Sequence, residues 1–99
     1  MRPFRLTPAA EDDLFDIWCF IAPENLQAAD RLQAELLAAC QRIADKPGMG
    51  HWRRDLTDKP VRFFTVRKTY LIVYDPASEP LAVIRVLHGA RDVSAQLEE

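Results

Sequence analysis

The sequence has no apolar run of the roughly 20 residues that a membrane-spanning helix needs. It also has no signal-peptide core, because acidic residues at positions 11–13 interrupt the first apolar stretch, so we expect a cytoplasmic protein. Cysteine is scarce: the chain of 99 residues has only Cys19 and Cys40. Both lie in apolar, helix-like contexts, and in a reducing compartment we expect buried thiols rather than a disulfide.

Motifs for metal or phosphate chemistry are missing too. The two cysteines and the two histidines, His51 and His88, do not have the spacing of a ligand set. The chain has three glycines and contains neither a glycine-rich phosphate loop nor a nucleophile elbow. The sequence therefore predicts no metal site and no cofactor.

Charge is divided unevenly along a chain of net charge −2. Residues 1–45 carry four basic and eight acidic groups, whereas residues 46–92 carry nine basic and five acidic groups. Either these are solvated faces of opposite sign, or the basic second half binds a polyanion or an acidic protein surface. With 48% hydrophobic and 28% charged residues, the chain is expected to form a single globular domain over residues 1–99.

Two helices are predicted at residues 8–22 and 24–46, after a short strand at residues 3–6. Thr7 is suited to cap the first helix and Pro8 to occupy its first turn. Pro23 ends that helix and is expected to open the second. Apolar residues recur at helical spacing in both segments, so each helix should bury one face.

Three strands are predicted at residues 61–67, 70–75 and 81–88, where β-branched and aromatic residues gather between short turns. The expected fold is α+β in the order β-α-α-β-β-β, with the helical hairpin packed on one face of an antiparallel sheet. The predicted core consists of Leu14, Ile17, Trp18, Leu32, Leu36, Ile43, Ile84 and Val86.

Arg85 lies in the middle of the last predicted strand. Strict alternation would place Ile84 and Val86 against the helices, and Arg85 with Leu87 on the uncovered face. The side chain would then form a surface ion pair with an aspartate of the second half (Asp55, Asp58 or Asp75), or bind a carboxylate or phosphate of a partner.

His88, Arg91 and Asp92 follow at the end of that strand. His88 could move a proton while Arg85 and Arg91 stabilise a phosphate, as in a metal-independent ribonuclease. The alternative, favoured by the chemistry alone, is that His88 and Asp92 bind backbone where the strand ends. The loop between the second predicted helix and the strand at residues 61–67 carries Trp52, Arg53 and Arg54. These side chains are candidates for contact with a target, or they form an ordinary solvated loop.

Three segments resemble the ParE toxins of the RelE/ParE superfamily: RLTPAAEDDLFDIW at the start, VRKTYLIVYD in the central strand and VIRVLHGARD at the close. The matching positions are Thr7, Ala10, Asp13, Leu14, Ile17, Trp18, Val66, Arg67, Tyr70, Ile72, Val73, Tyr74 and residues 83–92.

The resemblance implies a type II toxin that a ParD-like antitoxin neutralises in a hetero-oligomer, and that inhibits DNA gyrase by binding, without enzymatic activity. We expect acidic groups of the antitoxin to meet basic residues of the sheet, namely Arg62, Arg67, Arg85 and Arg91. The alternative is the RelE branch of ribosome-dependent mRNA endoribonucleases. Members of that branch often carry a tyrosine near the C-terminus, which the segment after Asp92 lacks.

Overall fold

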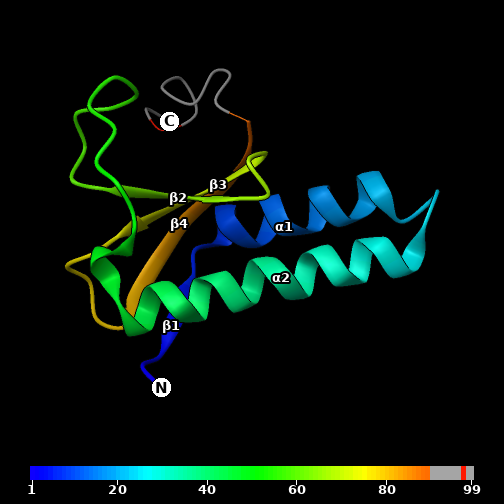
Figure 1. Cartoon of the computed structure of the whole chain (residues 1–99), viewed down its shortest axis with the longest axis horizontal. Helices are drawn as coiled ribbons and strands as arrows, with labels where there is room; N and C mark the ends of the chain where they lie inside the picture. The colour runs from blue at the N-terminus through cyan, green and yellow to red at the C-terminus, as the bar shows by residue number, and fades with distance from the viewer. Residues whose placement is uncertain (90–96, 98–99) are drawn as a thin grey trace.

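A helical hairpin dominates one side of the molecule and extends well beyond the sheet (Figure 1). The computed structural model describes residues 1–89 and Leu97. Its elements are β1 (Phe4–Leu6), α1 (Pro8–Ile21), α2 (Leu26–Asp45), the short 3-10 helix η1 (Pro47–Met49), β2 (Arg62–Val66), β3 (Tyr70–Asp75) and β4 (Leu81–His88). The predicted order of helices and strands is confirmed, with boundaries differing by up to two residues.

Both helices begin at side-chain caps. The hydroxyl of Thr7 accepts a hydrogen bond from the Ala10 amide, and Pro8 occupies the first turn of α1, as predicted. The start of α2 was predicted wrongly. Its cap is Asn25, whose side chain accepts from the Ala28 amide at 3.0 Å, so Pro23 lies in the turn before the helix rather than in its first turn. The helix begins after Asn25 because the side chain of Asn25 binds a backbone amide that has no partner within the first turn.

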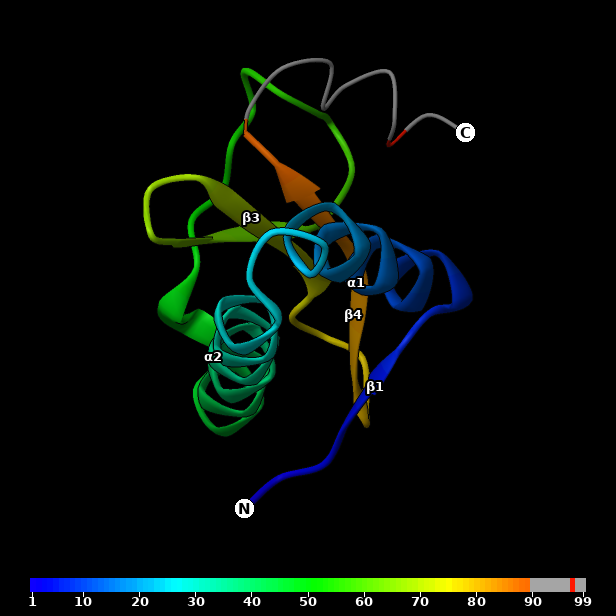
Figure 2. The same ribbon diagram turned by 90° about the vertical axis from the view of Figure 1, so that its right-hand side faces the viewer.

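The sheet has the strand order β1-β4-β3-β2. The β2-β3-β4 part is the predicted antiparallel meander. β1 instead pairs parallel to β4, with Phe4 opposite Leu81 and Leu6 opposite Val83, so the sheet is mixed. Figure 2 views the hairpin end-on and shows α1 beside β4, against which it packs.

A β-bulge interrupts the alternation of β4. Arg85 lies opposite Val73 and Val83 lies opposite Tyr74, which leaves Ile84 without a partner on β3. The extra residue shifts the faces, so Val83 and Val86 both pack toward the helices. Ile84 packs on the opposite face, and its predicted place against the helices is wrong.

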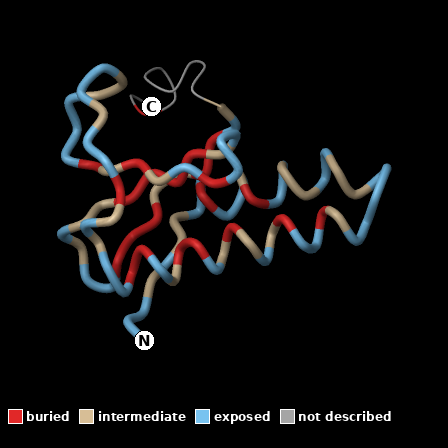
Figure 3. The backbone as a smooth tube through the Cα atoms, in the orientation of Figure 1, coloured by how far each residue is buried: buried red, intermediate tan, exposed pale blue. Residues whose placement is uncertain are grey.

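The sheet has an apolar cluster on each face, and Figure 3 shows the buried segments meeting where the helices cross it. The cluster on the face of the hairpin includes the predicted Leu14, Leu32, Leu36, Ile43 and Val86. Ile17, Trp18 and Ile84 are only partly buried. On the second face, Val61, Phe63, Leu71, Val73 and Leu87 pack with Leu97, so a residue of the chain's own tail lies on this face.

The distal part of the hairpin is more exposed than its base. Cys40 is buried and Cys19 is exposed, which corrects the prediction that both are buried, and both are free thiols. Exposed apolar side chains also occur here: Phe15 is 63% exposed, Phe20 84% and Leu26 56%. Neither α1 nor α2, in the part of the chain that is described, has the length and apolar content of a membrane span.

Candidate functional site

Arg85 is bound within the chain by α1. Its Nε and Nη2 atoms donate to the carboxylate of Asp13 at 2.7 and 2.9 Å, and that carboxylate also accepts from the Val86 amide at 2.9 Å. Both side chains are mostly buried, 19% and 13% exposed. The predicted ion pair of Arg85 with an aspartate of the second half of the chain is therefore wrong. The register does place Arg85 opposite Val73, on the face of Leu87 as predicted, but its guanidinium reaches Asp13 of α1.

The sequence did not predict Asp13 as the partner of Arg85. Its position carried a signal: Ala10, Asp13, Leu14 and Ile17 have the spacing of one helical face, and Ala10 and Leu14 are buried on it. β1 ends after pairing with Val83, so the rest of β4 has an open edge on that side. Asp13 binds the Val86 amide at this edge, where a sheet would otherwise present an unpaired donor.

His88 ends β4 and is exposed. Its ring lies 5.1 Å from that of Tyr70, tilted by 39°. A pocket of about 270 Å³ opens beside it, lined by Asp16, Ile17, Phe20, Ile21, Tyr70 and His88. Of the arginines proposed to act with His88 in a ribonuclease, Arg85 is bound to Asp13. Arg91, like Asp92, lies outside the described residues.

Arg67 and Lys68 form the tip of the β2-β3 hairpin in the left-handed backbone region, with φ of 56° and 60°. The Arg67 guanidinium binds the Glu35 carboxylate of α2, with a shortest distance of 2.8 Å. This hydrogen-bonded pair lowers the pKa of Glu35 and raises that of Arg67. Arg67 remains about half exposed, so its cation lies at the surface where the hairpin tip meets α2.

A second group of basic side chains surrounds Trp52, which is 43% exposed. The guanidinium carbon of Arg62 lies 4.4 Å from the centre of the indole ring, and that of Arg54 lies 5.8 Å from it. We call Trp52, Arg54 and Arg62 the tryptophan cluster. Arg53 is not part of it, because it pairs with Asp55 at 2.9 Å.

Buried contacts hold the backbone beneath this cluster. Arg62 Nη1 donates to the Gly50 carbonyl at 2.7 Å. The hydroxyl of fully buried Tyr74 accepts from the Gly50 amide at 2.8 Å and donates to the Pro47 carbonyl at 2.6 Å. Burial raises the pKa of Tyr74, which keeps the hydroxyl protonated as a donor. The core therefore fixes the position of Arg62.

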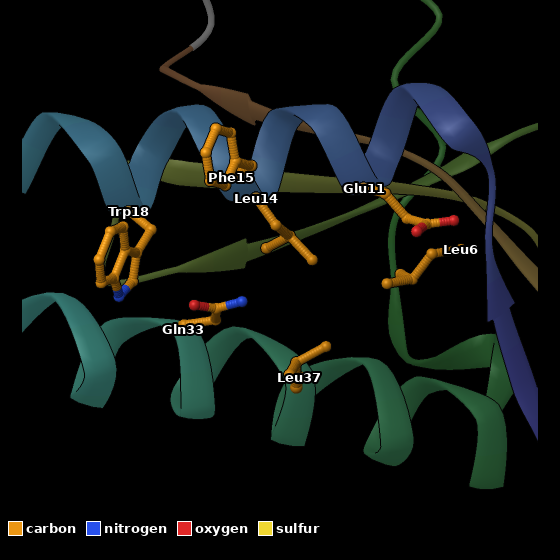
Figure 4. A pocket seen from close by; sticks show the side chains of 7 residues that line it. All are labelled: Leu6, Glu11, Leu14, Phe15, Trp18, Gln33 and Leu37. Atoms are coloured by element: carbon orange, nitrogen blue, oxygen red, sulfur yellow. The ribbon is translucent and has the colours of Figure 1, made fainter.

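An open groove of about 430 Å³ runs between α1 and α2 (Figure 4). Its lining combines apolar side chains with two polar ones: Leu6, Glu11, Leu14, Phe15, Trp18, Gln33 and Leu37. The indole of Trp18 also donates to Asp30 across the hairpin at 2.8 Å. Among residues 1–89 and 97, no group of three histidine, cysteine or acidic side chains could hold a metal ion.

Comparison with known proteins places this geometry in a family. Residues 4–93 match the family described as ParE toxin of the type II toxin–antitoxin system parDE. Toxin ParE1 of Caulobacter vibrioides is 30% identical over 106 aligned positions, covering 98% of this chain and 99% of that protein. A solved structure of a chromosomal ParDE toxin–antitoxin system from P. aeruginosa has the same fold, with a TM-score of 0.73 at 16% identity over 90% of this chain and 97% of that one. The chain therefore belongs to the ParE family of type II toxins.

Proposed function

We propose that this chain is a toxin that a ParD-like antitoxin neutralises in a hetero-oligomeric complex, and that it inhibits DNA gyrase in the cytoplasm by binding rather than by catalysis. Membership in the ParE family supports the toxin role. The observation that carries the choice of binding over catalysis is the ion pair between Arg85 and Asp13.

A ribonuclease stabilises the charge that develops on the phosphate with cations aimed at it. The carboxylate of Asp13 neutralises Arg85 and takes two of its donor atoms. Arg67 is likewise paired, with Glu35 on α2. Both pairings favour a surface that recognises a protein over a site that clamps a reacting phosphate.

The antitoxin would contact the hairpin groove and the basic sheet. An antitoxin tail that is disordered until bound could place an apolar helix in the groove between α1 and α2, beside Leu14 and Leu37. The tail could then extend toward the tip of the β2-β3 hairpin. Its acidic groups would compete with Glu35 for Arg67. Strained backbone tends to occur at functional sites, and Arg67 with Lys68 is such a place, which supports a binding role for Arg67. Arg85 and Arg91 remain predicted contacts.

Expression of the chain without antitoxin tests the target. DNA synthesis should stop and the DNA-damage response should begin while protein synthesis continues at first. In vitro, the purified chain should block supercoiling by purified gyrase. Rapid arrest of translation, with messages cut at ribosomes, would contradict the proposal and favour the ribonuclease.

Charge reversal tests the antitoxin surface. Arg67→Glu should weaken antitoxin binding, measured by calorimetry, because it replaces an exposed cation with a group that also repels Glu35. Arg5→Glu is the matched control, since Arg5 is exposed on β1 at the other edge of the sheet. Arg85→Glu would set a carboxylate against Asp13, so its binding is interpreted only alongside its unfolding curve. Wild-type affinity in Arg67→Glu would contradict the predicted interface at Arg67.

A further inference from the structure

The tryptophan cluster combines the residue types that dominate protein–protein contacts. Trp and Arg are enriched among interface residues that contribute most of the binding energy. Arg54 and Arg62 have no carboxylate within ion-pair distance in residues 1–89 and 97, whereas Arg53, Arg67 and Arg85 all have one. The cluster therefore presents unneutralised cations around an exposed indole ring.

The cluster is also held in place before any partner arrives. Arg62 is tied to the Gly50 carbonyl at 2.7 Å and stacks at 4.4 Å from the indole of Trp52. Gly50 is fixed by Tyr74, and there is no room for a larger residue: a Cβ atom at position 50 would lie 2.5 Å from the Tyr74 hydroxyl. Preorganised side chains lose less conformational entropy on binding, which raises affinity.

We propose that Trp52, Arg54 and Arg62 form the surface by which this toxin grips an acidic segment of its target protein. This inference rests on the proposed function, and it moves Arg62 from the predicted antitoxin surface to the target surface. The fork of a guanidinium binds a carboxylate through two hydrogen bonds. The indole covers the apolar part of the same segment and excludes water from the ion pairs.

A protein segment fits this surface better than a nucleic acid strand. Nonspecific strand binding needs a groove of positive charge with several stacking aromatics along it. The described part of the 50–60 loop has one aromatic residue, Trp52, and also carries Asp55 and Asp58. The whole chain has a net charge of −2, which opposes binding to a polyanion.

The test compares three cluster variants, Trp52→Ala, Arg54→Ala and Arg62→Lys, with Arg53→Ala as the matched control from the same loop. Each chain is produced with its antitoxin, released and refolded, and its thermal unfolding is recorded. Binding to purified gyrase without DNA, to the antitoxin, and to a 30-nucleotide single-stranded DNA is then measured at low and high salt, and growth inhibition is measured in cells.

We expect each cluster variant to bind gyrase at least about tenfold more weakly and to lose toxicity, while its affinity for the antitoxin stays within about twofold of wild type. Arg53→Ala should behave as wild type. Wild-type affinity for gyrase should also fall as salt rises. Folded cluster variants that keep both gyrase affinity and toxicity would overturn the inference and leave the proposed function standing.

The other outcomes separate the two proposals. If cluster variants lose only antitoxin binding, the surface belongs to the antitoxin and the inference is wrong. If the wild-type chain binds the oligonucleotide and cluster variants lose that binding, the partner is a nucleic acid and the inference is also wrong. A last outcome is that the wild-type chain neither binds nor inhibits gyrase and does not bind DNA, yet the cluster variants lose toxicity. The tryptophan cluster is then still the target surface, but gyrase is not the target.

Discussion

The carboxylate of Asp13 binds the guanidinium of Arg85 at 2.7 Å, across 72 residues of sequence. The same carboxylate accepts the amide of Val86, on the edge of β4 that β1 leaves uncovered. Thr7 binds the neighbouring part of this edge, since its amide and hydroxyl donate to the carbonyls of Val83 and Ile84. Thr7, which caps α1, and Asp13 within α1 thus bind β4 beyond its pairing with β1.

Asp13→Ala should lower the free energy of unfolding by about 2–3 kcal/mol, because it leaves the Arg85 cation and the Val86 amide without this acceptor in a mostly buried place. Asp12→Ala is the control: Asp12 is exposed on the same helix, and its loss should change stability by no more than about 0.5 kcal/mol. Urea unfolding of both variants measures the difference. Equal stability of Asp13→Ala and wild type would show that Arg85 finds other acceptors of equal value.

The elements of this fold could be predicted because their signals are local. A Thr-Pro pair before an amphipathic segment, such as Thr7-Pro8, indicates the start of a helix. Runs rich in β-branched and aromatic residues, such as 70–75, indicate strands. The bulge at Ile84 could not be predicted, because alternation assumes unbroken pairing. The parallel pairing of β1 with β4 depends on which strand edge is open after the meander forms, and no local pattern records that.

The candidate site was less predictable than the fold. Trp52 and Arg54 were found as neighbours in sequence, but Arg62 joins them only because β2 passes beneath the loop. Asp13 and Arg85 meet because α1 crosses β4. Both relationships depend on contacts between distant segments, whereas composition had indicated only that the second half is basic.

Gly50→Ala should destabilise the fold by about 1–3 kcal/mol, as overpacking of a filled site does. The added Cβ would lie 2.5 Å from the Tyr74 hydroxyl and 2.9 Å from the Phe63 carbonyl oxygen. Gly48→Ala is the matched control, because a Cβ there would meet nothing within 4 Å. Thermal and urea unfolding should separate the two variants; equal curves would mean that the loop shifts freely away from Tyr74.

Replacing Arg67-Lys68 by Asn-Gly should stabilise the chain by about 1–2 kcal/mol. Both positions have positive φ, which costs non-glycine residues energy and which Asn-Gly adopts readily in a two-residue hairpin. The same variant should bind the antitoxin more weakly, because it lacks the cation of Arg67. Lys68→Gly alone should gain stability and keep antitoxin affinity. A double variant that binds as tightly as wild type would remove Arg67 from the interface.

Alkaline pH should destabilise the chain through Cys40. Burial raises the pKa of this thiol to about 12, whereas an exposed thiol ionises near 9. The contribution of the neutral, buried thiol to the free energy of unfolding is therefore fully present below about pH 9. Up to about 4 kcal/mol of it is lost as the pH rises toward 12. Urea unfolding in reductant should show a smaller decline over this range for Cys40→Ala than for wild type. Cys19→Ala should decline as wild type does; parallel curves for wild type and Cys40→Ala would contradict the prediction.

His88→Gln decides between the two mechanisms for the toxin. Under inhibition by binding, glutamine keeps a hydrogen-bonding side chain at the end of β4 next to Tyr70, and toxicity should follow the amount of folded protein. Under the ribonuclease mechanism, removal of the general base or acid should lower the rate of message cleavage by about 10²–10⁴-fold. Growth inhibition and message cleavage are measured at matched levels of folded chain, with Tyr70→Phe as the control for loss of the neighbouring ring's hydroxyl. We expect His88→Gln to remain toxic. If the wild-type chain cuts messages at ribosomes and a stably folded His88→Gln variant is not toxic, the toxin acts by catalysis instead.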